Sequence, residues 1–197
     1  MTADYFSSDG ATYPNYDNIG PCAFYDAADN KTWDCREAWN GSHRQITVTV
    51  FDHGAGNITD YTVSTNTLTN DDHGEGALCM DHEGYVHLYW GAHLSPLHHA
   101  VTTNPRDPTA WTIRPNITTT HPGAGGVSYP HPCQVGSVQY LLLRDTLSGT
   151  HKPCCLFYTT SLSGGVETWS SRIDIADYGL GSDGLGTWFY SSLMYVA

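Results

Sequence analysis

The amino-acid sequence predicts an all-β protein, and three observations support this fold class. Helical periodicity is nearly absent from the chain. Short alternating apolar and polar runs recur about every 10–15 residues, and the segments between them are rich in Gly, Asn, Asp and Pro, which is typical of strands joined by turns. A chain of 197 residues can bury one core, so we expect a single domain over residues 1–197.

The expected strands are the runs in which β-branched and aromatic residues gather between turn residues. The clearest is Gly84–Trp90, which reads G-Y-V-H-L-Y-W. One helical turn is expected over Asp174–Tyr178. In chain order the predicted strands are Ala23–Tyr25, Gln45–Phe51, Ile58–Val63, Gly76–Met80, Tyr85–Trp90, Leu97–Thr102, Gln134–Leu143, Cys155–Thr160 and Tyr190–Val196.

An imperfect internal repeat indicates how the strands are grouped. Each unit is a strand, a loop, a second strand and then a Trp, and counterparts lie about 55 residues apart, close to the size of one propeller blade. The stretch Gln45–Thr65 reads as the remains of an earlier unit. The two matching units are Gly84–Trp90, Leu97–Thr102 and Trp111, and then Gly136–Leu142, Cys155–Thr160 and Trp169.

The repeat predicts a partial β-propeller of roughly three to four blade-like units of antiparallel strands. Propellers usually close with about four to eight blades. The sequence also ends in an apolar run at Tyr195–Ala197, which would leave a bare strand edge open to pairing. We therefore expect either a fragment of a longer polypeptide or a sheet completed by neighbouring chains, including a homo-oligomer.

Composition and charge exclude several classes of partner. The formal net charge is −12, from 20 acidic and 8 basic residues, which argues against DNA or RNA because nucleic-acid binding uses clustered Lys and Arg. No apolar run is long enough to span a bilayer, and no signal-peptide pattern follows Met1. We expect no membrane association and an extracellular or virion-associated location. The acidic surface weighs mildly against a polyanionic glycan, although salt screens that field beyond about 8–10 Å.

The cysteines leave metal and disulfide chemistry open. Six are present, and Cys22–Cys35 is the pair that we expect to form a disulfide, whereas Cys79 lies in an apolar run and is expected to be a buried thiol. The segments His131–Cys133 and His151–Cys155 contain zinc-type ligands at no standard spacing, so a structural Zn or Ca ion stays an alternative to thiols or disulfides there. The sequence has no P-loop, dinucleotide fingerprint, H-E-x-x-H or G-x-S-x-G motif.

Four residues are candidates for a catalytic site. His73 and His93 each lie in a Gly-rich bend flanking the Gly84–Trp90 run, Tyr129 lies in the turn S-Y-P, and Arg144 ends a strand. Imidazole and phenol can exchange a proton, and a guanidinium can hold a carboxylate through two hydrogen bonds. Taken singly, each residue also has an ordinary structural interpretation: a loop histidine, a turn tyrosine, or an ion pair between Arg144 and Asp145.

Taken together, these residues resemble the BNR-repeat β-propellers, and among them the ulvan lyases, which are polysaccharide lyases acting on uronic-acid glycans. The resemblance rests on D-D-H at Asp71–His73, the G-x-V-H-L-Y-W-G-x-H run ending at His93, S-Y-P at Ser128–Pro130 and L-R-D at Leu143–Asp145. It is best over residues 71–169. The stretch after Arg144 is poorer in glycine than in the family, and family members are much longer.

The resemblance implies β-elimination on an acidic polysaccharide, with no cofactor required for catalysis. It implies that Arg144 neutralises the uronate carboxylate, that Tyr129 and His73 form the base and acid pair, and that His93 orients the carboxylate. A non-catalytic glycan-binding or structural module of a virion appendage or extracellular filament is the alternative. A glycoside hydrolase also stays open, because several carboxylates crowd the same region. They are Asp71, Asp72, Glu75, Asp81 and Glu83.

Overall fold

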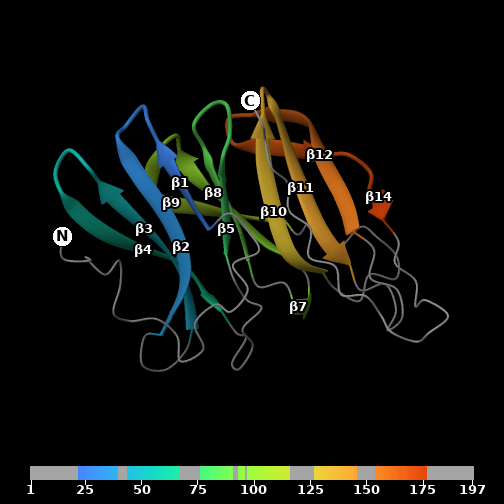
Figure 1. Ribbon diagram of the computed structural model, residues 1–197, viewed down its shortest axis with the longest axis horizontal. Coiled ribbons are helices and arrows are strands. Elements are labelled where there is room, and N and C mark those ends of the chain that lie inside the picture. The colour runs from blue at the N-terminus through green and yellow to red at the C-terminus, as the bar shows by residue number, and fades with distance from the viewer. Residues whose placement is uncertain are drawn as a thin grey trace.

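The computed structural model describes residues 22–39, 44–66, 76–90, 93–95, 97–115, 127–145 and 154–176. Within these ranges all regular secondary structure is β-strand, and none of them contains a helix able to cross a membrane. The strands form three antiparallel sheets arranged side by side (Figure 1). The predicted all-β fold of blade-like units is therefore confirmed.

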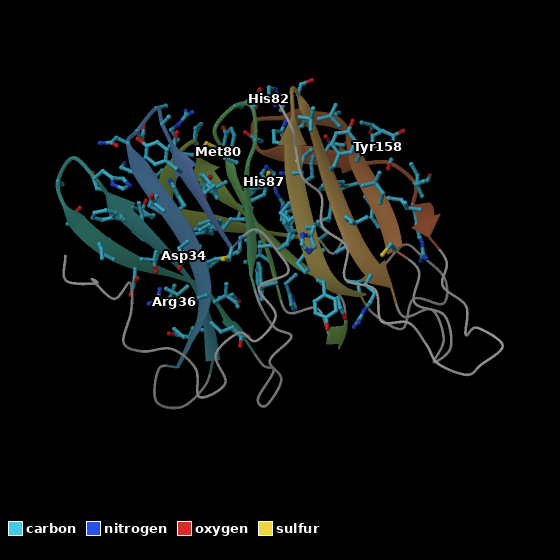
Figure 2. The ribbon with its side chains drawn as sticks, in the orientation of Figure 1. Asp34, Arg36, Met80, His82, His87 and Tyr158 are labelled. Carbon is cyan, nitrogen blue, oxygen red and sulfur yellow. The ribbon has the colours of Figure 1, made fainter. Side chains whose placement is uncertain are left out.

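The first sheet is a complete four-stranded meander rather than the remains of a unit. Strand β2 was not predicted, although it alternates buried Trp33 and Cys35 with the partly exposed Asp34 and Arg36. Figure 2 shows the last two side chains on β2. The sequence did not predict this strand because charged residues alternate with the apolar ones along it. The strands are β1 (Ala23–Asp26), β2 (Lys31–Trp39), β3 (Arg44–Asp52) and β4 (Asn57–Asn66), paired in chain order.

The second and third sheets repeat this up-and-down order, and their strands match the repeat in the sequence. The second sheet contains β5 (Ala77–Met80), β6 (Val86–Trp90), β8 (His98–Asn104) and β9 (Asp107–Arg114). The third contains β10 (Val127–Val135), β11 (Val138–Asp145), β12 (Cys154–Ser163) and β13 (Val166–Trp169). Two short strands extend the third sheet: β7 (His93–Ser95) pairs with β10, and β14 (Ile173–Ala176) pairs with β12.

Three local predictions were wrong. Gln134–Leu143 is not one strand, because the chain reverses at Gly136, whose φ of 58° closes the β10–β11 hairpin. The helical turn expected from Asp174 is strand β14, which is held by pairing with β12. His93 begins strand β7 rather than lying in a bend, because β10 supplies a partner strand. The strand predicted over Tyr190–Val196 lies outside the described residues.

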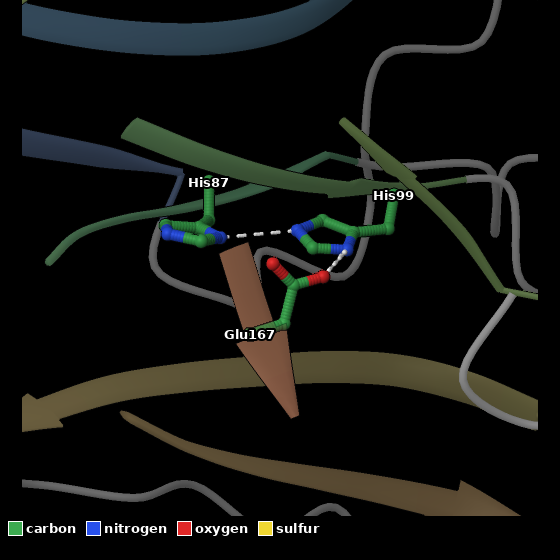
Figure 3. A group of neighbouring side chains, drawn as sticks. All are labelled: His87, His99 and Glu167. Carbon is green, nitrogen blue, oxygen red and sulfur yellow. Dashed lines mark hydrogen bonds and ion pairs between the residues drawn. The ribbon is translucent and has the colours of Figure 1, made fainter. Parts of the chain in front are cut away.

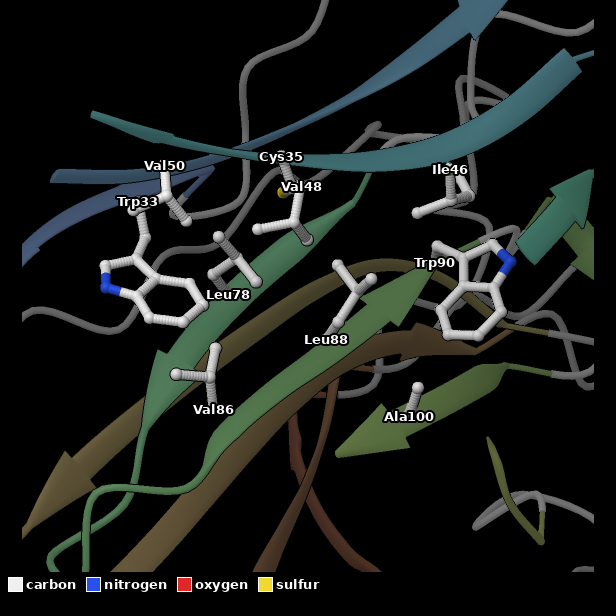
Figure 4. Close-up of a cluster of buried hydrophobic side chains, with 10 residues drawn as sticks. All are labelled: Trp33, Cys35, Ile46, Val48, Val50, Leu78, Val86, Leu88, Trp90 and Ala100. Carbon is white, nitrogen blue, oxygen red and sulfur yellow. The ribbon is translucent and has the colours of Figure 1, made fainter. Parts of the chain in front are cut away.

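Strand β6 is buried on both faces, as expected of a strand in the middle of a stack of sheets. Val86, Leu88 and Trp90 face the first sheet, where they form an apolar core with Trp33, Cys35, Ile46, Val48, Val50, Leu78 and Ala100 (Figure 4). Side chains alternate along a strand, so His87 and Tyr89 point to the other face. The two faces of β6 therefore line two different interfaces. The interface between the first and second sheets, called the first seam, is apolar, and the interface between the second and third sheets, called the second seam, is more polar.

The second seam, between the second and third sheets, combines apolar packing with polar contacts. Its apolar part is formed by Tyr89, Leu97, Val127, Leu141, Leu143, Cys155 and Phe157. At its rim, Glu83 accepts hydrogen bonds from the β12–β13 turn, and Arg114 donates to the carbonyl of Gly165 at 2.7 Å. A Cβ at Gly165 would lie 2.8 Å from a ring carbon of Tyr85, so the turn approaches the second sheet too closely for a side chain.

Candidate active site

The third sheet brings three segments that are distant in sequence into one row. His93 on β7 pairs with Ser128 on β10, and Ser128 pairs with Arg144 on β11. Arg144 in turn pairs with Cys154 on β12. Residues directly opposite one another in an antiparallel ladder have Cα atoms about 4.5–5.5 Å apart. The backbone therefore places two of the predicted site positions, His93 and Arg144, on either side of Ser128.

A β-bulge places Tyr129 at this row. Between the Ser128–Arg144 and His131–Leu142 pairs, β10 has two residues where β11 has one. Tyr129 is the first of these two, and its φ of 58° lies in the left-handed region, which costs a non-glycine residue about 1–2 kcal/mol. Bulges re-aim side chains and occur often beside active sites. The strain is compatible with a functional constraint on the direction of the Tyr129 ring.

The bulge brings the Tyr129 ring against the Arg144 guanidinium. The central carbon of the guanidinium lies 4.3 Å from the ring centroid, and the two residues are only 9% and 4% exposed. This cation–π contact is worth about 0.5–2 kcal/mol, more when it is shielded from water. An arginine remains charged at neutral pH even when buried. The contact therefore holds a permanent positive charge beside a phenol.

Two buried polar atoms beside this pair have no hydrogen-bond partner within the described structure. They are the Oγ atom of Ser128 and the Nε2 atom of His131. Burial lowers the pKa of His131 to about 4, so its imidazole is neutral at neutral pH. Buried polar groups normally have partners, which makes unpartnered ones candidates for contact with water or a ligand. From the sequence, His131 was considered only as a possible metal ligand. Ser128 was considered only as part of the S-Y-P motif, and no role was predicted for its hydroxyl group.

The four predicted site residues are described to different extents. Tyr129 and Arg144 are described in full and are in contact. The backbone of His93 lies in the same row, but its side chain lies outside the described part, and His73 lies in the undescribed segment 67–75. The proximity of Tyr129 and Arg144, 15 residues apart in a sheet, could be inferred from the sequence only through the family resemblance.

Two of the carboxylates that left a glycoside hydrolase open form hydrogen bonds with other parts of the protein. Asp81 is buried and accepts hydrogen bonds from the backbone N–H groups of Glu83 and Tyr85 and from His87. Although burial opposes ionisation, these bonds lower the pKa of Asp81 below its usual value. Glu83 binds the β12–β13 turn. Neither is therefore placed as a general acid, whereas Asp71, Asp72 and Glu75 lie outside the described residues.

A cavity of about 330 Å³ lies away from this row and holds none of the four predicted residues. It is lined by parts of β2, β3, β4 and the β8–β9 hairpin, including Lys31 and Arg106. Both cations are already paired, Lys31 with Asp29 at 3.5 Å and Arg106 with Asp26 at 2.9 Å. This cavity therefore contains none of the residues that the sequence predicts for catalysis.

Among the described residues, one group could hold a metal ion. His87, His99 and Glu167 offer ligand atoms that all lie within 4.8 Å of one another. This cluster lies at the second seam, and a metal at His131–Cys133 or His151–Cys155 stays an untested alternative. Cys79 is a buried thiol, as predicted, and burial raises its pKa to about 12. The backbone N–H of Cys35 donates to the carbonyl of Cys22 at 2.8 Å, so the two residues are neighbours. The disulfide between them stays a prediction.

Comparison with solved structures gives a consistent view of the fold. The chain is similar to an ulvan lyase of polysaccharide lyase family 25, with a TM-score of 0.74 and 17% sequence identity over 91% of this chain. The same lyase type bound to a GlcA-(1-4)-Rha3S glycan matches with a TM-score of 0.73 and 17% identity. The chain spans 42% of the length of each of these proteins. At this identity the likeness establishes the fold.

The family assignment comes from the sequence of the three sheets. No curated protein matches the chain. The model of the BNR repeat-containing family matches residues 23–174, which extend from the start of β1 into β14 and include all three sheets. The match covers well over half of the chain and agrees with the repeat found in the sequence. The chain therefore belongs to the BNR repeat-containing family.

Proposed function

We propose that this chain carries the catalytic residues of a polysaccharide lyase that cleaves a uronic-acid-containing glycan of the ulvan type by β-elimination. The observation that carries the proposal is the contact between the Arg144 guanidinium and the Tyr129 ring at a strained bulge, in one row with the backbone of His93. The similarity to ulvan lyases over 91% of the chain supports the same reaction class. Acidic polysaccharide is accordingly the proposed partner.

Arg144 has the properties required to activate the substrate. The C5 proton of a uronate is too weakly acidic to remove while the adjacent carboxylate carries its full charge. A buried, permanently charged guanidinium can hold that carboxylate by two parallel hydrogen bonds and stabilise the enolate-like charge of the transition state. Arg144 is 4% exposed, so its interaction with an anion would be weakly screened by solvent.

Tyr129 and His73 are the proposed base and acid. One group takes the C5 proton, the electron pair forms the C4–C5 double bond, and the bond from C4 to the glycosidic oxygen breaks. The other group gives a proton to the leaving oxygen, so the products are an unsaturated sugar and a new hydroxyl end. His93 would orient the carboxylate.

The function is tested by incubating the 197-residue protein with ulvan and other uronic-acid polysaccharides and measuring two products. A lyase releases unsaturated sugar, detected by ultraviolet absorbance, together with new reducing ends. A glycoside hydrolase releases reducing ends without that absorbance. Carboxyl-reduced ulvan is the matched control, because without its carboxylates it gives Arg144 nothing to neutralise and should yield no unsaturated product.

The alternative function is a glycan-binding or structural module. The net charge of −12 favours the structural module, because like charges repel an anionic chain at long range. Saturable binding of ulvan, with neither absorbance nor reducing ends, would replace the lyase proposal by this one. Absence of both binding and products on every uronate glycan would refute the lyase and the glycan-binding module, and would leave the structural module.

A further inference from the structure

A row of four buried acid and imidazole groups crosses the second seam. The Nε2 atom of His87 lies 3.3 Å from an Asp81 carboxylate oxygen, and its Nδ1 atom lies 3.1 Å from Nε2 of His99. The Nδ1 atom of His99 lies 3.2 Å from Oε1 of Glu167, as Figure 3 shows. The side chains of Asp81, His87 and His99 are fully buried, and that of Glu167 is 6% exposed.

The row contains one hydrogen too few for its contacts. Three contacts between donors and acceptors need three hydrogens, and two neutral imidazoles supply one N–H each. The two carboxylates supply none when ionised. One of the three contacts therefore lacks a hydrogen, and the 3.1 Å gap between the facing nitrogens of His87 and His99 is where a cation would take its place.

A metal ion fits this row, because two facing ring nitrogens can bind one ion with no hydrogen between them. Metal coordination uses neutral imidazole nitrogens of this kind. The Nε atom of Arg114 lies 3.9 Å from Oε2 of Glu167, too far for a direct hydrogen bond. Oε2 is buried and has no hydrogen-bond partner in the described structure.

The distances suit a small divalent ion. Two nitrogens bound to tetrahedral zinc at about 2.0–2.1 Å lie roughly 3.3 Å apart, close to the 3.1 Å between His87 and His99. Metal-binding histidines usually direct their second ring nitrogen at a carboxylate, and both histidines do so here. In Figure 3 the second Glu167 oxygen points toward the line between the facing nitrogens.

We propose that His87 Nδ1, His99 Nε2 and Glu167 bind one divalent cation of the zinc class, with Asp81 orienting His87. The ligands come from β6, β8 and β13, so the ion would cross-link the second and third sheets. Its role would be structural. The site is independent of the proposed lyase activity, because it uses none of the residues assigned to the reaction.

The test measures metal binding and stability of the complete chain after chelation. Zinc is added back, and its stoichiometry and dissociation constant are determined by calorimetry and metal analysis. We expect one tight site per chain, a zinc-dependent rise in the melting temperature, and visible absorption bands from Co²⁺ bound in place of zinc. Chelated wild-type protein that shows neither tight zinc binding nor a rise in melting temperature would overturn the proposal.

Variants separate this site from adventitious binding by the other histidines. His99→Gln should abolish the tight site, whereas His98→Gln should keep it, because the neighbouring His98 is exposed on the opposite face of β8. Asp81→Asn should weaken zinc binding by about 10–100-fold while leaving the ligands in place. Equal zinc binding by His99→Gln and wild type would refute the assignment. If His99→Gln does not fold, Co²⁺ binding is compared between Asp81→Asn and wild type. Weaker binding by the variant supports the site, and equal binding or no Co²⁺ bands in either protein refutes it.

Discussion

Replacing Tyr129 with Phe isolates the phenolic oxygen at the candidate active site. The ring remains, so the contact with the Arg144 guanidinium at 4.3 Å is retained, and so is the left-handed backbone with its φ of 58°. The free energy of unfolding should therefore change by no more than about 1 kcal/mol, the usual value of one hydrogen bond. Loss of a general acid or base should lower kcat about 10²–10⁴-fold, or about 3–5 kcal/mol in the activation barrier.

The assay follows unsaturated sugar released from ulvan, alongside denaturant unfolding of the same preparations. Tyr129→Ala is the comparison, because it removes the buried ring as well and should lower the free energy of unfolding by about 3–5 kcal/mol, through the lost packing and the lost cation–π contact. If Tyr129→Phe retains activity within about threefold of wild type, Tyr129 is neither acid nor base. If it unfolds as readily as Tyr129→Ala, the ring contact does not stabilise the bulge.

Three further substitutions test the packing and electrostatics of the three sheets. Leu88→Ala removes a fully buried side chain from the first seam and should cost about 2–5 kcal/mol in denaturant unfolding; a loss below about 1 kcal/mol would contradict close packing there. Gly165→Ala should lower stability by about 1–3 kcal/mol, because φ is 67° and the new Cβ would meet Tyr85 at 2.8 Å, and an unchanged melting temperature would contradict this. Burial raises the pKa of Asp34 to about 6 although Arg36 lowers it, so the folded state loses stability as pH rises from about 4 to 6. Asp34→Asn should then be more stable than wild type by about 1–2 kcal/mol near pH 8, after discounting for partial exposure, and no more stable below about pH 4; equal stability near pH 8 would refute the shift.

The sequence predicted the fold well where one face of a strand is uniformly apolar. The alternation of Val86, Leu88 and Trp90 identifies β6, and the Trp111 and Trp169 counterparts identify the repeat. Strand β2 was missed because its outward residues are charged. The helical turn expected from Asp174 failed for a different reason: a four-residue segment has too little periodicity to decide its structure, and pairing with β12 decides it instead.

The site was less predictable than the fold because it depends on register. The motif S-Y-P suggested a turn at Tyr129, whereas the structure places a bulge there inside β10. A bulge is defined by a partner strand, and nothing in the motif specifies that β11 offers one residue against two. His99 lies on the face opposite His98 because side chains alternate along a strand, but its contact with His87 depends on the β6–β8 register.

The contrast between the two seams supports the inference of a cation. The first seam is filled by aliphatic and aromatic side chains, which gain stability simply by leaving water. The second contains two carboxylates and two imidazoles, whose burial is costly unless each charge is matched. Without a cation, the two buried carboxylates would therefore weaken contact between the sheets that carry the row. A divalent ion would turn this polar seam into a cross-link, and it would hold the third sheet, with Tyr129 and Arg144, in place relative to the second.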